Sequence, residues 1–208
     1  MTDLLRGLRF FENLRVVHYD LKPANILISS SLRLIIGDFG LMKSIDQRSA
    51  GPLGTYRFTA PELFAGETAD FKSDVFSVGM ILYELLALHH PFIITNEEQG
   101  NYNLHVANEA TNRRAWREII LNRPLLPLHS HLCEVAPPAT ALIEEMLKKK
   151  RAERPLASQL LTSAFLIKNV PELQHREQFV KQARLESKMA QIEEENEVLT
   201  LYFLLVSI

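Results

Sequence analysis

The sequence has little of what marks several classes of protein. Its 208 residues contain one cysteine, Cys133, which excludes an internal disulfide and leaves no cluster of the usual zinc-binding spacing. The net charge is only −2, so neither nucleic acid nor an anionic membrane is expected as a general partner. The longest apolar run, residues 199–208, is too short to span a bilayer, and no transmembrane segment is expected.

The first ten residues also lack the long apolar core of a signal peptide. Together with the single cysteine, this indicates a reducing, intracellular compartment, and the cytoplasm is the location we expect. Apolar residues make up 47% of the chain and charged residues 23%, which are ordinary values for globular proteins. The length allows one domain with a substantial core and an appendage.

Hydrophobic periodicity predicts a mainly α-helical fold with one small β-hairpin. Apolar residues three and four apart between Leu4 and Leu14 indicate an amphipathic helix. Two short apolar runs, 26–28 and 32–36, are separated by three serines and predict the strands of a hairpin. The stretch 75–88 is apolar on nearly every face, as expected of a helix that is buried on all sides.

Four further segments complete this prediction. Helices are expected around 138–149 and 156–161. The polar stretch 43–57, punctuated by glycine and proline, predicts a long loop. The polar, Asn-rich stretch 94–113 predicts a surface insertion.

The last forty residues differ in character from the rest, which predicts a boundary between residues 1–168 and a helical extension, 169–208. From Pro171 to Glu197 there is no glycine and the charge density is high. Five residues alternate spacings of four and three, as in a short heptad seam with one polar member. These residues are Leu185, Met189, Ile192, Asn196 and Leu199. Two alternatives stay open: a solvated helix lying on the domain, or a coiled-coil site for a helical partner through residues 172–200.

Short motifs in a fixed order carry the functional signal. His18 opens the run His-Tyr-Asp-Leu-Lys-Pro-Ala-Asn, and Asp-Phe-Gly follows at 38–40. Later motifs are Gly-Thr at 54–55, Ala-Pro-Glu at 60–62, Asp-x-x-Ser-x-Gly at 74–79 and Arg-Pro at 154–155. In this order and spacing they resemble the motifs of eukaryotic protein kinases, over about residues 4–166. Lys22 followed by Pro23 resembles the Ser/Thr form of the catalytic loop.

The resemblance implies transfer of the γ-phosphoryl group of ATP to Ser or Thr hydroxyls of a protein substrate. Asp20 would accept the hydroxyl proton, and Lys22 would place an ammonium near the γ-phosphate. Asn25 and Asp38 would ligate Mg²⁺ through oxygen, the donor that this cation prefers. The implied cofactors are therefore ATP and Mg²⁺.

Other matched positions are implied to support the site rather than to react. Thr55 would bond to Asp20 and Lys22. Glu62 and Arg154 would form a buried ion pair, and Asp74 would hold the backbone of the catalytic loop. Four residues have other expected places: His18 packs beneath the Phe39 ring, His89 and His90 lie on a loop, and Cys133 packs as a small hydrophobe.

Two departures from the family pattern agree with each other. Tyr19 stands where the family commonly has an arginine that grips a phosphate on the activation loop. Gly51 stands at the position commonly phosphorylated, and glycine has no acceptor. Together they predict a loop that this phosphate pair does not switch. Phe58 and Phe76 replace a common tyrosine and tryptophan but keep aromatic bulk.

A larger departure is that no Gly-rich loop, Val-Ala-x-Lys strand or hinge occurs in the 208 residues. We therefore expect the large, C-terminal lobe of a kinase without the small ATP-binding lobe. Three hypotheses follow: a Ser/Thr kinase that is weakly active or inactive as this chain alone, a catalytically dead interaction module derived from a kinase, and a fragment of a longer kinase whose start precedes Met1.

Overall fold

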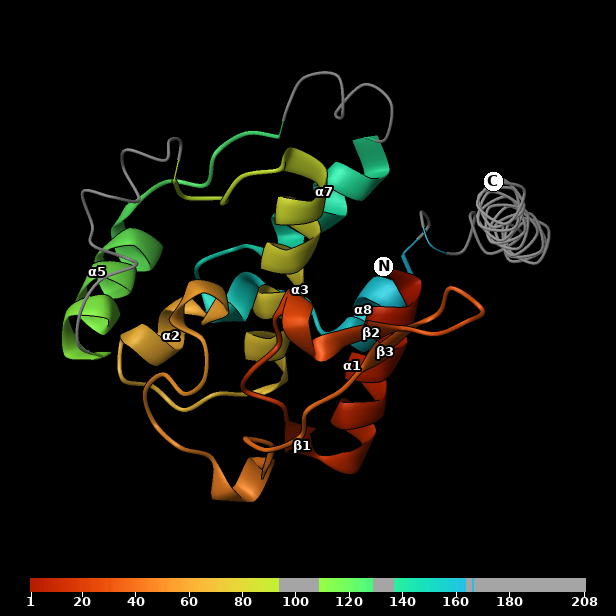
Figure 1. The fold of residues 1–208 in the computed structure, drawn as a ribbon, viewed down its shortest axis with the longest axis horizontal. Coiled ribbons are helices and arrows are strands. Elements are labelled where there is room, and N and C mark those ends of the chain that lie inside the picture. Colours follow the sequence, from red (N-terminus) through yellow and green to blue (C-terminus); the bar gives the residue numbers. More distant parts are fainter. Residues whose placement is uncertain (94–108, 129–136, 164–165, 167–208) are drawn as a thin grey trace, which may run out of the picture.

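The computed structural model describes residues 1–93, 109–128, 137–163 and 166 (Figure 1). In these ranges the fold is mainly helical, with two small two-stranded antiparallel sheets. Among the same residues, no helix is long and apolar enough to cross a membrane. The predicted mainly α-helical class with a small hairpin is thereby confirmed.

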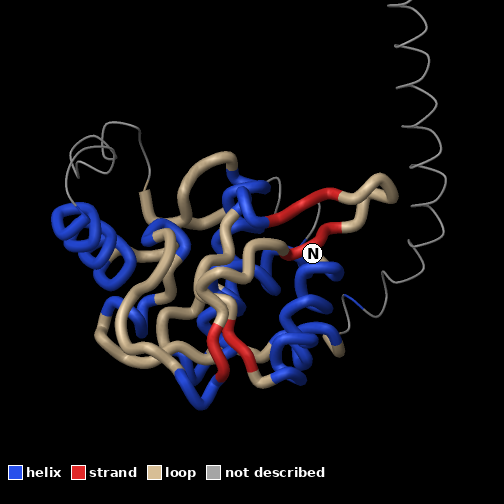
Figure 2. Tube along the Cα trace, turned by 60° about the horizontal axis from the view of Figure 1, so that its bottom comes forward, coloured by secondary structure: helices blue, strands red, loops and turns tan. Residues whose placement is uncertain are grey.

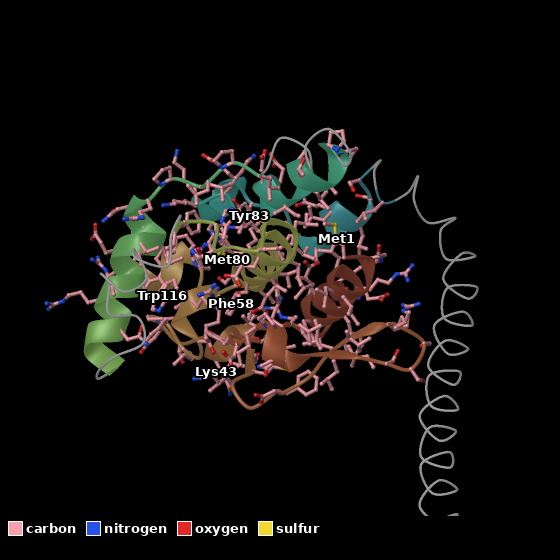
Figure 3. All side chains as sticks on the ribbon, turned by 45° about the horizontal axis from the view of Figure 1, so that its top comes forward. Met1, Lys43, Phe58, Met80, Tyr83 and Trp116 are labelled. Carbon is pink, nitrogen blue, oxygen red and sulfur yellow. The ribbon has the colours of Figure 1, made fainter. Side chains whose placement is uncertain are left out.

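Helix α3, Phe71–Ala87, forms the centre of the described fold (Figure 1). Three helices pack around it: α1, Thr2–Leu14, α7, Pro137–Met146, and α8, Ala157–Leu161. Asp70 precedes α3 and forms a capping box with Ser73. The Asp70 side chain accepts a hydrogen bond from the backbone of the first turn, and the Ser73 side chain accepts one from the Asp70 amide. The helix is buried from Ser73 through Tyr83, and Figure 3 shows Met80 and Tyr83 in this interior. The prediction of burial on all sides fails at the end of the helix, where Leu88 is 89% exposed.

Helix α1, Thr2–Leu14, confirms the amphipathic helix that the sequence predicted. Its buried apolar face packs on α3, on strand β3, Leu34–Ile36, and on α8. The buried apolar residues of α1 are Leu4, Leu5, Leu8 and Phe11. Arg15 ends the helix in the left-handed conformation, with a φ of 56°. Glu12 joins the two ends of the domain, because its carboxylate accepts a hydrogen bond of 2.7 Å from the Ala157 amide.

The predicted hairpin is present as strands β2, Ile26–Ile28, and β3, Leu34–Ile36, with Ile26 opposite Ile36 (Figure 2). A second pair joins β1, Val16–Val17, to β4, Lys43–Ser44. The prediction of a long loop over 43–57 was therefore partly wrong. This segment holds β4 and two 3₁₀ turns, η2, Ile45–Gln47, and η3, Tyr56–Phe58.

The second half of the domain adds α2, Pro61–Phe64, α5, Glu109–Asn122, and α7, Pro137–Met146. Helices α7 and α8 agree with the two predicted helices, although α7 ends before residue 149, and η4, Arg151–Glu153, lies between them. The predicted insertion over 94–113 is wrong at its end, since α5 begins at Glu109. Helix α5 buries Trp116, Ile119 and Ile120, and Figure 3 places Trp116 on it.

Several predictions concern residues outside those that the structure describes. They are Cys133, most of the insertion from 94 to 108, and the helical extension over 169–208 with its heptad seam and partner site at 172–200. The boundary between residues 168 and 169 lies there as well. All of these stay predictions.

His90 lies after α3, on a loop as expected, but it is fully buried, whereas His89 is exposed. Its ring packs against Trp116 and Phe92, with centroids 5.1 and 5.9 Å away. Nδ1 accepts a hydrogen bond of 3.1 Å from the Phe92 amide. Burial, with the positive charge of Arg57 nearby, lowers the pKa of His90 to about 3.

We expect His90 to make the fold sensitive to acid. The unfolded histidine binds a proton below about pH 6.5, whereas folded His90 stays neutral, so its contribution to stability is lost as the pH falls. Between pH 6.5 and 5 this amounts to about 2 kcal/mol. Asp74, whose pKa burial raises to about 7, acts in the opposite direction, so the difference between variants is the informative quantity.

The matched variant is His90→Asn, because an asparagine oxygen can accept from the amide two residues on and does not titrate. Urea unfolding at pH 7 and pH 5 should show the acid-induced loss to be smaller in His90→Asn by about 2 kcal/mol. Equal losses in the two proteins would contradict the buried neutral histidine.

Candidate active site

The carboxylate of Asp20 is the centre of the candidate site, and two side chains and one backbone amide hold it. Lys22 Nζ donates a hydrogen bond of 2.6 Å to Oδ2, and the Thr55 amide donates one of 2.8 Å to Oδ1. Lys22 Nζ also donates to Thr55 Oγ1 at 3.1 Å, which closes a triangle. Asn25 Nδ2 donates 2.8 Å to the Asp20 carbonyl and 3.3 Å to Oδ2. The sequence motifs alone predicted that these four residues belong to one site, and in the structure they are in contact.

The electrostatics keep Asp20 ionised. Burial by itself would raise its pKa, but the hydrogen bonds from Lys22 and Thr55 outweigh burial and lower the pKa below that of an ordinary aspartate. Asp20 is therefore a carboxylate at neutral pH and can accept a proton or a hydrogen bond.

Gly54 makes this arrangement possible, a role that the motif did not reveal. Its φ is +68°, a conformation that other residues rarely adopt. A Cβ atom at this position would lie 2.5 Å from Asp20 Oδ1. The segment can thus approach the carboxylate closely enough for the Thr55 amide to bind it.

Asp74, at the start of α3, holds the backbone that carries Asp20. Its Oδ2 accepts from the His18 amide at 2.7 Å and its Oδ1 from the Tyr19 amide at 3.2 Å. These bonds fix Tyr19 at a φ of 70°, which is uncommon for a bulky residue. The backbone turn that presents Asp20 is therefore anchored to the buried start of the central helix α3.

The β2–β3 hairpin connects the catalytic loop, which carries Asp20, to the Asp-Phe-Gly loop at 38–40. The Gly37 amide donates 2.8 Å to the Asn25 carbonyl, so Asn25 and Asp38 flank the same end of the hairpin. His18 Nδ1 accepts from the Asp20 amide at 3.3 Å, which leaves the proton on Nε2 to be donated to the Gly37 carbonyl at 3.1 Å. Burial lowers the His18 pKa, which favours this neutral form.

Phe39 packs on His18, as expected, with ring centroids 5.8 Å apart. Phe11 completes the cluster, at 5.9 Å from His18 and 6.2 Å from Phe39. The cluster joins α1, the catalytic loop and the Asp-Phe-Gly loop. Phe39 nevertheless remains 54% exposed on its other side.

The donor set fits a magnesium ion. Asp38 is exposed, with a φ of 57°, and its Oδ1 accepts from the Gly40 amide at 3.2 Å. Asn25 uses Nδ2 on Asp20, which leaves its side-chain oxygen as a ligand. Mg²⁺ is typically bound by one or two protein groups together with substrate phosphates and water. Among the described residues no cluster of three or more His, Cys, Asp or Glu could hold a metal, so a site built from protein ligands alone is not present there.

Glu62 and Arg154 form the expected buried ion pair. Arg154 Nη2 lies 2.7 Å from Oε2 and Nη1 lies 2.9 Å from Oε1, in a two-pronged contact. Ser73 Oγ donates to Oε1 at 2.7 Å, and the guanidinium also binds backbone carbonyls, among them that of Lys148. The bonds from Arg154 hold the Glu62 pKa low, although burial opposes this.

A second ion pair lies beside the site and was not predicted. Arg57, two residues after Thr55, donates from Nε to Glu84 of α3 at 3.0 Å. Burial raises the Glu84 pKa against the effect of this pair. Arg57 and Glu84 carry no motif of their own, and only their opposite charges could have suggested a contact.

A helical domain that holds an ionised aspartate against a lysine, with a second aspartate at the end of the adjoining hairpin, has the make-up of a protein kinase. The comparisons agree: the family model described as "Protein kinase domain" matches residues 1–166. The chain belongs to the protein kinase domain family.

Three of the similar proteins are described as serine/threonine-protein kinases. Serine/threonine-protein kinase VIK of Arabidopsis thaliana is 40% identical over 117 residues, which are 51% of this chain and 26% of that protein. Serine/threonine-protein kinase Nek3 of Mus musculus is 30% identical over 169 residues, 80% of this chain and 29% of that protein. Serine/threonine-protein kinase PLK1 of Xenopus tropicalis is 29% identical over 168 residues, 79% of this chain and 25% of that protein. The chain spans about a quarter of the length of these relatives.

Proposed function

We propose that the site transfers the γ-phosphoryl group of ATP to Ser or Thr hydroxyls of a protein substrate. One observation carries the proposal: an ionised Asp20 is held on both oxygens, by Lys22 and by the Thr55 amide, beside Asn25. Phosphoryl transfer requires this kind of fixed acceptor for the attacking hydroxyl. The Ser/Thr relatives support the choice of substrate class.

The residues divide the work as follows. Asp20 orients the substrate hydroxyl and takes its proton as the oxygen bonds to phosphorus and the bond to the ADP oxygen breaks. Lys22 keeps Asp20 in place and offers positive charge to the transferred group. Asn25 and Asp38 would hold Mg²⁺, which supplies charge neutralisation of the phosphates when bound. Thr55 fixes the distance between the catalytic loop and its own segment, between β4 and α2, over which we expect the substrate to bind.

We further propose that the described domain is the large lobe of the kinase. Apolar side chains on the hairpin support this, because Leu27 is 57% exposed and Ile28 68% exposed. Leu27 lies directly opposite Ile35 of the neighbouring strand, which is 49% exposed, so this side of the hairpin presents an apolar face of the kind that a partner domain covers. The same face favours the second candidate function, a kinase-derived interaction module that binds without catalysis. The cytoplasmic location and the protein substrate also remain proposals.

The 208-residue chain alone is expected to bind ATP·Mg²⁺ weakly, with a dissociation constant well above tens of micromolar. The physical reason is that its sequence offers no Gly-rich loop or Val-Ala-x-Lys strand to cover the phosphates. Calorimetric titration of this chain with ATP·Mg²⁺ measures the constant. Binding at or below tens of micromolar, about −6 kcal/mol or stronger, would contradict the large-lobe proposal.

Phosphoryl transfer itself is tested on the protein in its full natural length. Transfer from radiolabelled ATP to a serine-rich protein substrate should be lost largely in Asp38→Asn and restored in part by raised Mg²⁺. Asp46→Asn is the matched control, because Asp46 is an exposed carboxylate that pairs with Arg15 away from the site. Absence of transfer in the unmodified protein would favour the interaction module.

A further inference from the structure

Tyr19 reaches from the catalytic loop to the segment between β4 and α2. Its hydroxyl oxygen accepts a hydrogen bond of 3.0 Å from the Ser49 amide, and the hydroxyl has a longer contact of 3.5 Å with the Ser49 carbonyl. Thirty residues of sequence separate the two, so this contact is tertiary. The phenol therefore engages the backbone of Ser49, whatever its side chain carries.

The tyrosine is held firmly at its other end. Its side chain is 7% exposed and belongs to a small apolar cluster with Val17, Ile45, Leu63 and Ala69. Its amide binds Asp74, which is itself buried at the start of α3. Burial raises the Tyr19 pKa, so the hydroxyl stays neutral at physiological pH. A buried, neutral phenol with a fixed backbone can act as a rigid support.

The segment beyond Ser49 leads directly to the site. Lys43 Nζ donates to Ser49 Oγ at 2.5 Å, and the Gly51 amide donates to the Glu67 carbonyl at 3.1 Å. Six residues after Ser49, the Thr55 amide binds Asp20. Fixing the position of Ser49 therefore restricts the motion of residues 49–55, and this segment places the Thr55 amide against the Asp20 carboxylate.

We propose that Tyr19 is a positioning residue that pins this segment against the catalytic loop without any phosphate. This pin is the hydrogen bond between the Tyr19 hydroxyl and the Ser49 backbone. It restricts the motion of Gly51 and Thr55 further along the segment. The effect on catalysis rests on the proposed function, because the segment positions Thr55, which binds the proposed catalytic residue Asp20. The structural part stands independently of activity, because it concerns only how the segment is held.

Tyr19→Phe deletes the hydroxyl and keeps the ring. Amide hydrogen exchange, followed residue by residue by NMR in the full chain, should be about five- to tenfold faster at Gly51 and Thr55, the effect of one lost hydrogen bond. Amides inside α3, such as that of Met80, should keep their exchange rates. Phosphatase treatment of the unmodified chain should leave Gly51 and Thr55 as protected as before.

Tyr83→Phe is the matched control, because the Tyr83 hydroxyl also donates to a backbone carbonyl, that of Leu126 at 3.0 Å, away from the segment. It should leave Gly51 and Thr55 unchanged. The pin is refuted if Tyr19→Phe speeds exchange only at Ser49, if it speeds all amides alike, or if phosphatase alone loosens the segment.

A transfer assay separates this proposal from the proposed function. In the full-length protein Tyr19→Phe should lower kcat several-fold and leave the KM for ATP unchanged, since the residues proposed to hold Mg²⁺, Asn25 and Asp38, lie outside the segment. An unchanged kcat would overturn the positioning role. Loosening of Gly51 and Thr55 in a protein that transfers no phosphate would refute the proposed function and leave the pin in place.

Discussion

Replacing Arg154 with alanine is expected to lower the free energy of unfolding by about 3–5 kcal/mol. The guanidinium is fully buried, and its removal leaves the Glu62 carboxylate in the interior without its main partner. The guanidinium also packs 5.0 Å from the Phe76 ring, so a cavity forms beside the central helix. Set against a total of about 5–15 kcal/mol for a typical domain, this loss is severe.

A double-mutant cycle isolates the pair. Glu62→Ala should cost a similar amount, and the double variant should lose much less than the sum of the two single losses. Urea unfolding of the four proteins, monitored by circular dichroism, gives the interaction energy. Lys150→Ala is a suitable control, because its contact with Glu153 is exposed and should be worth little. Additive losses would mean that the pair is not in contact.

Asp20→Asn is expected to reduce phosphoryl transfer by about 10²–10⁴-fold in the full-length protein. Asparagine has nearly the same shape and can still accept from the Thr55 amide. It cannot take a proton from the substrate hydroxyl, and it no longer pairs as a charge with Lys22. The loss should therefore lie in the chemical step rather than in folding.

Single-turnover transfer at saturating ATP, together with a thermal melt, measures the two quantities separately. The variant should unfold cooperatively and show the same circular dichroism as the unmodified protein. The Asp46→Asn variant again provides a carboxylate-to-amide change outside the site. Transfer at near the unmodified rate in Asp20→Asn would remove Asp20 from the proposed mechanism.

Motifs predicted the long-range contacts better than periodicity predicted the elements. Glu62 and Arg154 lie 92 residues apart, and no local pattern joins them; the resemblance to kinases did. The same holds for Asp74 and the backbone of His18. Periodicity found α1 and the hairpin, because each carries several apolar residues on one face.

What the sequence did not disclose has a physical reason in each case. Strands β1 and β4 are only two residues long, too short to show alternation. Helix α5 begins with polar residues, which hide the buried face around Trp116. His90 is polar but is buried between the nearby Phe92 and Trp116, which lies in a later helix of the chain. The Tyr19 hydroxyl binds the backbone of Ser49, so the residue type at position 49 gives no sign of the contact.

The bond between Glu12 and the Ala157 amide has a consequence for how the chain is made. Its two ends are 145 residues apart, and α1 and α8 pack together along it. At about 5–20 residues per second, a ribosome takes roughly 7–30 s to add the second after the first. During this time the apolar face of α1 has no α8 to cover it. Synthesis of the domain thus includes an interval in which its first helix depends on chaperones or on the nascent α3 for cover.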